Sequence, residues 1–306
     1  MKSGQQDVNQ WRVEIARRVA PVYTALPVVR AVVLTGGVAR GLGDAYSDID
    51  LAVFWDRAPT EVERRIAQGK IGRALGAKVI NGDLQAHQVL GPTDHGMLWE
   101  EAAYVAGGAD TGFKIDINHR TVEAMTRILA DVVLQHDTHP HKQEVLYAIR
   151  RVVVLYGAEL VQRWQAQAAI YPEALARKIV TAHLDALRVD VAMHITRGDW
   201  LPYYQTLTAA ESHLLGVLLA LNRIYRPELK RLQHLCDEMT IKPPALAERL
   251  HGILRAEPAQ AVTALDKLVL EVFELVSLHL PQVSIKAARQ RYFQRRQPFS
   301  LPPLDL

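Results

Sequence analysis

Two aspartates separated by one residue stand at the start of an apolar run, in "SDIDLAVFW" (47–55). Side chains alternate between the two faces of a β-strand, so Asp48 and Asp50 are expected on one face and the intervening Ile49 on the other. Two ionised carboxylates side by side repel each other unless a cation lies between them. Oxygen ligands suit Mg²⁺, which fills its other positions with water and substrate phosphates. The spacing therefore predicts a divalent-metal site.

A third acid lies in "GFKIDINH" (112–119), which alternates in the same way. The apolar positions of this segment predict a side that faces the core, which leaves Lys114, Asp116 and Asn118 on the opposite face. If this strand is the neighbour of 48–55, Asp116 joins the two earlier aspartates. A cluster of three carboxylates would then lie on one face of a sheet.

A pair of glycines precedes the aspartates in "LTGGVARG" (34–41). Gly36 and Gly37 end an apolar, strand-like run, and the residues after them are expected to begin a short helical turn. Backbone N–H groups at such a junction can hold a phosphate. Arg40 adds a planar guanidinium that matches phosphate oxygens. We interpret this stretch as a binding site for a polyphosphate.

The first half of the chain alternates between helical and strand-like patterns. Apolar residues at helical spacing predict helices over 8–25, 59–75 and 121–134, and strand patterns cover 31–36, 48–55 and 112–119, with weaker strand candidates at 84–90 and 102–107. Helices and strands mixed in this order are typical of a sheet covered by helices. The first half is therefore expected to hold the sheet that positions the three acids.

Helical patterns dominate the second half. A polar segment with a proline, 135–143, is expected to link the halves, and helices are expected over 143–167, 172–197, 200–224, 227–239, 244–255 and 258–280. This predicts an α+β protein with a sheet domain at 1–138 and an all-α helical bundle at 139–306.

Composition narrows the classes of protein further. The chain has 306 residues, of which 49% are hydrophobic and 23% charged, with a net charge of +3 and a single cysteine, Cys236. One cysteine excludes an internal disulfide, and the polar N-terminus does not predict a signal peptide, so we expect a cytoplasmic protein. The apolar runs are too short to cross a membrane. The sequence has no continuous basic stripe, so a nucleic-acid partner is not expected.

The glycine pair, a spacer of about ten residues and then acid–apolar–acid resemble the DNA polymerase β-like nucleotidyltransferase superfamily. The stretch "GGVARGLGDAYSDIDL" is most similar to the small bacterial branch that includes aminoglycoside and lincosamide nucleotidyltransferases, which carry a helical C-terminal domain. The residues that match the motifs of this superfamily lie at about 34–55 and 113–117. It implies a mixed sheet flanked by helices.

The resemblance also implies a reaction. A nucleoside triphosphate, with ATP expected, binds with two Mg²⁺ ions, an acceptor hydroxyl attacks the α-phosphorus, and pyrophosphate leaves. Carried over by position, Asp48 and Asp50 are metal ligands, and Asp116 binds the metal nearer the acceptor or acts as general base. The second glycine, Gly37, replaces the serine that is commoner in the family, and Ser47 is a candidate to supply the missing hydroxyl.

Several alternatives stay open at this point. Either Glu100 or Glu101 could be the general base in place of Asp116. The expected acceptor is a hydroxyl of a small molecule, with an antibiotic as one candidate, but a protein or an RNA acceptor, as in toxin–antitoxin pairs, is the alternative. A non-catalytic binding module on the same fold is a further alternative, which the three intact acids oppose. A homodimer is neither predicted nor excluded.

Overall fold

A computed structural model describes residues 2–76, 79–80, 99–106 and 112–295. The chain divides into two compact units, Met1–Ile170 and Tyr171–Leu306. This boundary differs from the one expected at 138, because a strand and a helix that follow the polar segment still pack with the sheet of the first unit. The strand candidate at 84–90 lies outside the described residues.

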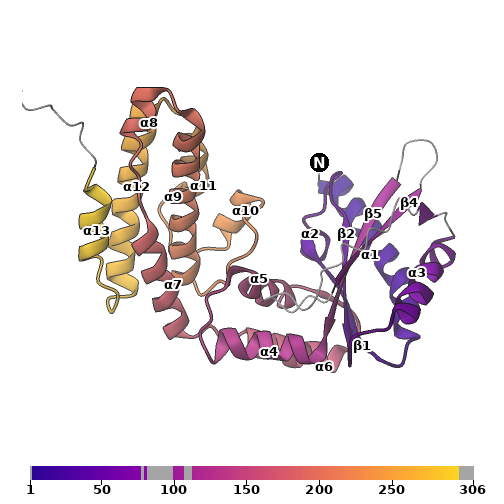
Figure 1. Ribbon diagram of the computed structural model, residues 1–306. Helices are drawn as coiled ribbons and strands as arrows, with labels where there is room; N and C mark the ends of the chain where they lie inside the picture. The colour runs from indigo at the N-terminus through magenta and orange to yellow at the C-terminus, as the bar shows by residue number, and fades with distance from the viewer. Residues whose placement is uncertain (1, 77–78, 81–98, 107–111, 296–306) are drawn as a thin grey trace, which may run out of the picture. The chain divides into compact units, whose positions relative to one another are not determined.

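The first unit is built on a mixed sheet (Figure 1). Its strands are β1 (Val29–Thr35), β2 (Ile49–Trp55), β3 (Val79–Ile80), β4 (Trp99–Ala106), β5 (Gly112–Thr121) and β6 (Val153–Tyr156). The described strands follow the order β3-β4-β5-β2-β1-β6. Strands β2 and β5 run parallel and the other pairs run antiparallel. The segments that carry the aspartates are therefore adjacent strands near the middle of the sheet, which meets the condition under which Asp116 joins the two earlier aspartates.

Helices cover this sheet on both faces. They are α1 (Lys2–Thr24), α2 (Gly36–Ala39), α3 (Glu61–Leu75), α4 (Val122–Val133), α5 (Pro140–Ile149) and α6 (Ala158–Ala168). Local sequence fixes some of their ends. For example, Thr60 and Glu63 form a capping box that starts α3, and Gly76 ends it in the left-handed conformation.

Successive side chains of β2 point to opposite faces of the sheet and so pack against different helices. Ile49, Leu51 and Trp55 are fully buried in a core cluster that also contains residues of α1 and α3. On the opposite face, Phe54 packs against Trp164 of α6, with ring centroids 4.7 Å apart. Asp50 stands near the start of β2, and its register partner Asp116 lies midway along β5.

The single long helix expected at 143–167 is wrong, because strand β6 lies within this segment. The segment folds as α5, then β6, then α6, and β6 adds an edge strand beside β1. Gly157, which follows β6, has φ +76°, and a Cβ there would come within 2.2 Å of the Arg30 carbonyl oxygen. The glycine is needed because the chain turns directly against the backbone of β1.

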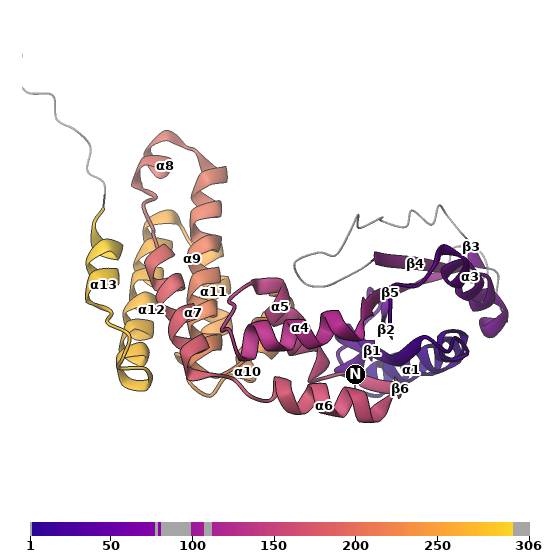
Figure 2. The same ribbon diagram turned by 60° about the horizontal axis from the view of Figure 1, so that its bottom comes forward.

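Within residues 171–295, the part of the second unit that the structure describes, every regular element is a helix. Its helices are α7 (Glu173–Ala186), α8 (Ala192–Arg197), α9 (Trp200–Leu221), α10 (Leu232–Asp237), α11 (Leu246–Arg255), α12 (Pro258–His279) and α13 (Lys286–Phe293). Figure 1 and Figure 2 both show α7, α9, α11 and α12 running side by side. Together the units have the expected α+β fold. Among the described helices, none is both long and apolar enough to cross a bilayer.

Candidate active site

Three aspartates lie near one end of the paired strands β2 and β5. Asp50 of β2 is the register partner of Asp116 of β5, and the two strands are parallel. Register partners in neighbouring strands point to the same face, with backbones roughly 4.8 Å apart. Asp48 stands two residues before Asp50 at the start of β2. We call Asp48, Asp50 and Asp116 the acid cluster.

A lysine links two members of this cluster. The Lys114 Nζ lies 2.8 Å from Asp116 Oδ2 and 3.9 Å from Asp48 Oδ2. The side chain of Asp116 is only 12% exposed, whereas those of Lys114 and Asp48 are 31% and 44% exposed. A positive charge therefore lies between two carboxylates that would otherwise repel each other. Sequence analysis placed Lys114 on this face but gave it no role.

Gly36 provides the space for the third carboxylate. It has φ +69°, and a Cβ built on it would lie 1.9 Å from Asp50 Oδ2. The carboxylate of Asp50 thus occupies the position that any larger residue would fill. The glycine is required both for its left-handed backbone and for this close approach.

We expect Gly36→Ala to destabilise the protein more than Gly41→Ala does. Both glycines have a left-handed backbone, which costs an alanine about 1–2 kcal/mol. A Cβ at Gly41 meets no atom of the described residues within 4 Å, so only the change at Gly36 also displaces Asp50. Urea denaturation of the two variants measures the difference. Equal losses in the free energy of unfolding would contradict the close approach.

The loop before Asp48 is held by the first helix. Asn9 of α1 donates to the Gly41 carbonyl at 3.1 Å, and its side-chain oxygen accepts from the Gly43 N–H at 2.9 Å. The buried Arg12, also on α1, donates from Nε to the Ser47 carbonyl at 3.0 Å. These contacts fix the backbone that leads into the acid cluster. Sequence reasoning missed them, because a polar residue on an amphipathic helix does not reveal a distant loop partner.

Ser47 is part of a hydrogen-bonded turn. Its hydroxyl donates to Asp44 Oδ1 at 3.0 Å and accepts from the Asp44 N–H at 2.9 Å. The Tyr46 N–H donates to the same carboxylate at 3.0 Å. In this arrangement the hydroxyl of Ser47 orders the turn before Asp48. Its suggested contact with a phosphate stays a prediction.

The glycine turn and Arg40 form one local unit. A short helix follows β1 as expected, but α2 begins at Gly36 and not after the two glycines, and Arg40 caps its C-terminal end. Arg40 donates from Nε to the Gly36 carbonyl at 3.2 Å and from one terminal nitrogen to the Tyr147 hydroxyl at 3.3 Å. The guanidinium is therefore held next to the glycine turn by contacts from both α2 and α5.

Comparison with known families agrees with this geometry. Residues 22–82 match the family model described as a nucleotidyltransferase domain. Residues 22–82 therefore belong to a nucleotidyltransferase domain. The match spans β1, the glycine turn and β2, and so includes two of the three aspartates. It confirms the resemblance to the nucleotidyltransferase superfamily, whereas membership of the antibiotic-modifying branch stays a prediction.

No curated protein matches the chain. Several solved structures resemble it weakly, among them the following two. A nucleotidyltransferase-like protein from Exiguobacterium sibiricum is 11% identical, with a TM-score of 0.40 over 87% of this chain and 77% of that one. Terminal uridylyl transferase 4 from Trypanosoma brucei, solved with bound dUTP, is 13% identical, with a TM-score of 0.24 over 92% of this chain and 70% of that one. Likenesses this weak say nothing about substrates.

The rival candidates for the general base lie on β4, the strand beside β5. Glu100 and Glu101 belong to β4, whose backbone pairs with β5 so that Glu100 is opposite Asn118 and Glu101 opposite Ile117. The register partner of Asp116 on β4 is Ala102. The side chains of both glutamates lie outside the described residues, so the choice between them and Asp116 needs an experiment.

The carboxylates of the acid cluster suit a hard cation. Asp48 and Asp116 already share one positive charge, the Lys114 ammonium, and Asp50 is the register neighbour of Asp116. Carboxylate oxygens are ligands that Mg²⁺ prefers. Among the described residues, no three acid, histidine or cysteine side chains are already gathered around a common metal position. The carboxylates would therefore have to turn away from Lys114 and Gly36 to bind a metal together.

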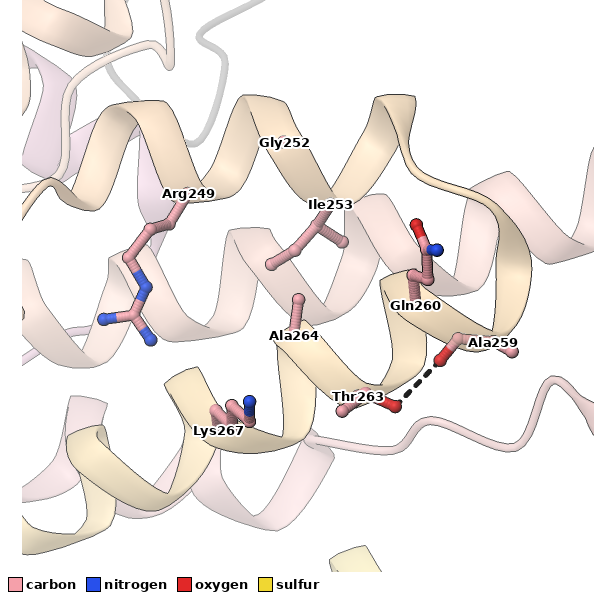
Figure 3. Close-up of a pocket in the computed structure, with 8 residues that line it drawn as sticks. All are labelled: Arg249, Gly252, Ile253, Ala259, Gln260, Thr263, Ala264 and Lys267. Atoms are coloured by element: carbon pink, nitrogen blue, oxygen red, sulfur yellow. Dashed lines mark hydrogen bonds between the residues drawn. The ribbon is translucent and has the colours of Figure 1, made fainter.

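A pocket of about 530 Å³ lies in the second unit, between α11 and α12 (Figure 3). Arg249 and Lys267 stand toward one end of it, and Gln260 and Thr263 toward the other. Arg249 forms a bidentate pair with Glu271, with both N–O distances 2.7 Å. This pocket contains none of the residues of the acid cluster, and it plays no part in the function proposed below.

Proposed function

We propose that this protein transfers a nucleoside monophosphate from a triphosphate to a hydroxyl of a small acceptor molecule. The observation that carries the proposal is the register of Asp50 with Asp116, next to Asp48 and the glycine turn, within a nucleotidyltransferase domain. ATP is the expected donor and Mg²⁺ the expected metal. An aminoglycoside or lincosamide antibiotic is the first acceptor class to test, and a cytoplasmic location stays a prediction.

Each residue of the site has a proposed task. Asp48 and Asp50 would hold Mg²⁺, and Asp116 would hold a second ion nearer the acceptor or take the proton from its hydroxyl. When bound, the metal supplies Lewis-acid stabilisation of charge on the phosphate oxygens. The backbone N–H groups of Gly36 and Gly37, with the Arg40 guanidinium, would bind the triphosphate.

One bond to the α-phosphorus forms and one breaks in the proposed reaction. The acceptor oxygen forms a new bond to the α-phosphorus, and the bond between that phosphorus and the bridging oxygen of the β-phosphate breaks. Pyrophosphate leaves with the electron pair of that bond. The hydroxyl proton passes to Asp116 or to one of the rival glutamates, Glu100 and Glu101.

The test uses each of the four ribonucleoside triphosphates, labelled at the α-phosphorus, with Mg²⁺. Acceptor mixtures contain aminoglycosides, lincosamides, tRNA or cell extract, and both label transfer and pyrophosphate release are measured. We expect label on a small molecule, and none with Asp50→Asn protein. Label on RNA or protein instead would replace the proposed acceptor class. No label and no pyrophosphate in any mixture would contradict nucleotidyl transfer.

We expect Arg40→Ala to weaken triphosphate binding by tenfold or more. A hydrogen bond to a charged group contributes about 1.5–3 kcal/mol, which corresponds to a factor of ~10 to 10² in the dissociation constant. Calorimetry with a non-hydrolysable ATP analogue and Mg²⁺ measures this change. Arg57→Ala removes the same charge from a surface pair with Glu63 and serves as the control. Equal affinities in both variants would rule out the proposed contact.

A further inference from the structure

The Lys114 ammonium lies within the acid cluster, where a metal cation would be expected to bind. Its ammonium contacts Asp116 directly, at 2.8 Å, and is also within 4 Å of Asp48. Since the strand alternates, Lys114 and Asp116 lie on the same face of β5, and the parallel register brings β2 alongside. The positive charge of Lys114 therefore lies between Asp48 and Asp116, two of the proposed metal ligands.

This contact has features that a purely structural ion pair does not need. Lys114 remains 31% exposed, and its flexible stem carries a compact charge with three rotatable donors. A carboxylate oxygen that binds Mg²⁺ at about 2.0–2.1 Å cannot keep an ammonium at the same point of contact. A metal that takes Oδ2 of Asp116 and Oδ2 of Asp48, the oxygens nearest Lys114, must therefore displace the ammonium from at least one of them.

We propose that Lys114 is an exchangeable counter-ion: it neutralises Asp48 and Asp116 before the metal binds, and moves to the phosphates of the nucleotide when the metal takes these carboxylates. The inference rests on the proposed function, because it assumes that a metal and a triphosphate occupy this site together. The incoming triphosphate is anionic, so the displaced ammonium would gain a new partner within reach of its side chain.

The exchange predicts effects of opposite sign for one substitution. Lys114→Gln removes the competing charge, so the affinity for a divalent cation alone should rise. The same change removes a charged contact to the phosphates, so the affinity for the nucleotide with Mg²⁺ should fall. A lysine that only supported the fold would not produce this pair of opposite changes.

The experiment measures both affinities without catalysis. Mn²⁺ serves as the probe of the metal site, because it favours the same oxygen ligands as Mg²⁺ and is detected by electron paramagnetic resonance. A non-hydrolysable ATP analogue with Mg²⁺ is titrated separately by calorimetry. Lys70→Gln, on the exposed face of α3, makes the same change of net charge away from the site. Lys114→Arg keeps the charge at the site and provides a second variant if Lys114→Gln folds poorly.

We expect Lys114→Gln to bind Mn²⁺ at least about threefold more tightly than the wild type, and the nucleotide about tenfold more weakly. Lys70→Gln should match the wild type in both titrations, and Lys114→Arg should bind Mn²⁺ no more tightly than the wild type.

Two other outcomes separate this inference from the proposed function. If the wild type binds Mn²⁺ and nucleotide but Lys114→Gln changes neither affinity, or lowers both, the exchange is wrong and the proposed function stands. If the wild type binds neither ligand, both are overturned.

Discussion

Asp50→Asn should abolish nucleotidyl transfer while the protein keeps its fold. The substitution preserves the shape of a side chain that lies against Gly36, so the packing at the glycine turn is retained. It removes one anionic ligand from the proposed metal site. A metal ion contributes several kcal/mol of transition-state stabilisation, so the rate should fall by about 10³-fold or more. Pyrophosphate release at saturating Mg²⁺ measures this loss.

A matched control lies at the other end of the same strand. Asp56 directly follows β2 and forms an exposed ion pair with Arg30. Asp56→Asn makes the same chemical change outside the acid cluster and should keep wild-type activity, since exposed ion pairs contribute little to stability. If Asp50→Asn also retains wild-type turnover, Asp50 is not a metal ligand. Circular dichroism and thermal unfolding of both variants check that the fold is intact.

The strands around the acid cluster could be predicted because their sequence patterns are local. Apolar residues flank the aspartates in β2 and β5, and Gly36 directly follows β1. The adjacency of Asp50 and Asp116 was a conditional prediction, and the register of the two strands confirms it. The acids could be found from sequence because alternation and turn chemistry act over only a few residues.

Features that depend on distant partners could not be predicted in this way. Strand β6 is a short apolar run between two helices, and nothing local separates it from a buried helical turn. Because β6 pairs with β1, the first unit ends at 170 and not at 138, where the sequence analysis expected its end. The same reason applies to Arg12 and Asn9, which hold a loop far along the chain.

Asp116→Asn should reduce kcat strongly and leave nucleotide binding nearly unchanged. Asp116 is buried on the face it shares with Asp50, and an asparagine can still accept a hydrogen bond from Lys114 there. The proposed task of Asp116 concerns the acceptor hydroxyl and not recognition of the triphosphate. General-base assistance contributes about 10²–10⁴-fold, so a loss of that size is expected. Steady-state kinetics, with calorimetry for the ATP analogue, separate the two effects.

The two glutamates of β4 provide the comparison that decides between the candidate bases. Glu100→Gln and Glu101→Gln remove one carboxylate each from the strand beside Asp116 and should each change kcat by only a few-fold. Asp116 would lose its proposed role if one of these variants lost activity on the larger scale while Asp116→Asn stayed close to the wild type.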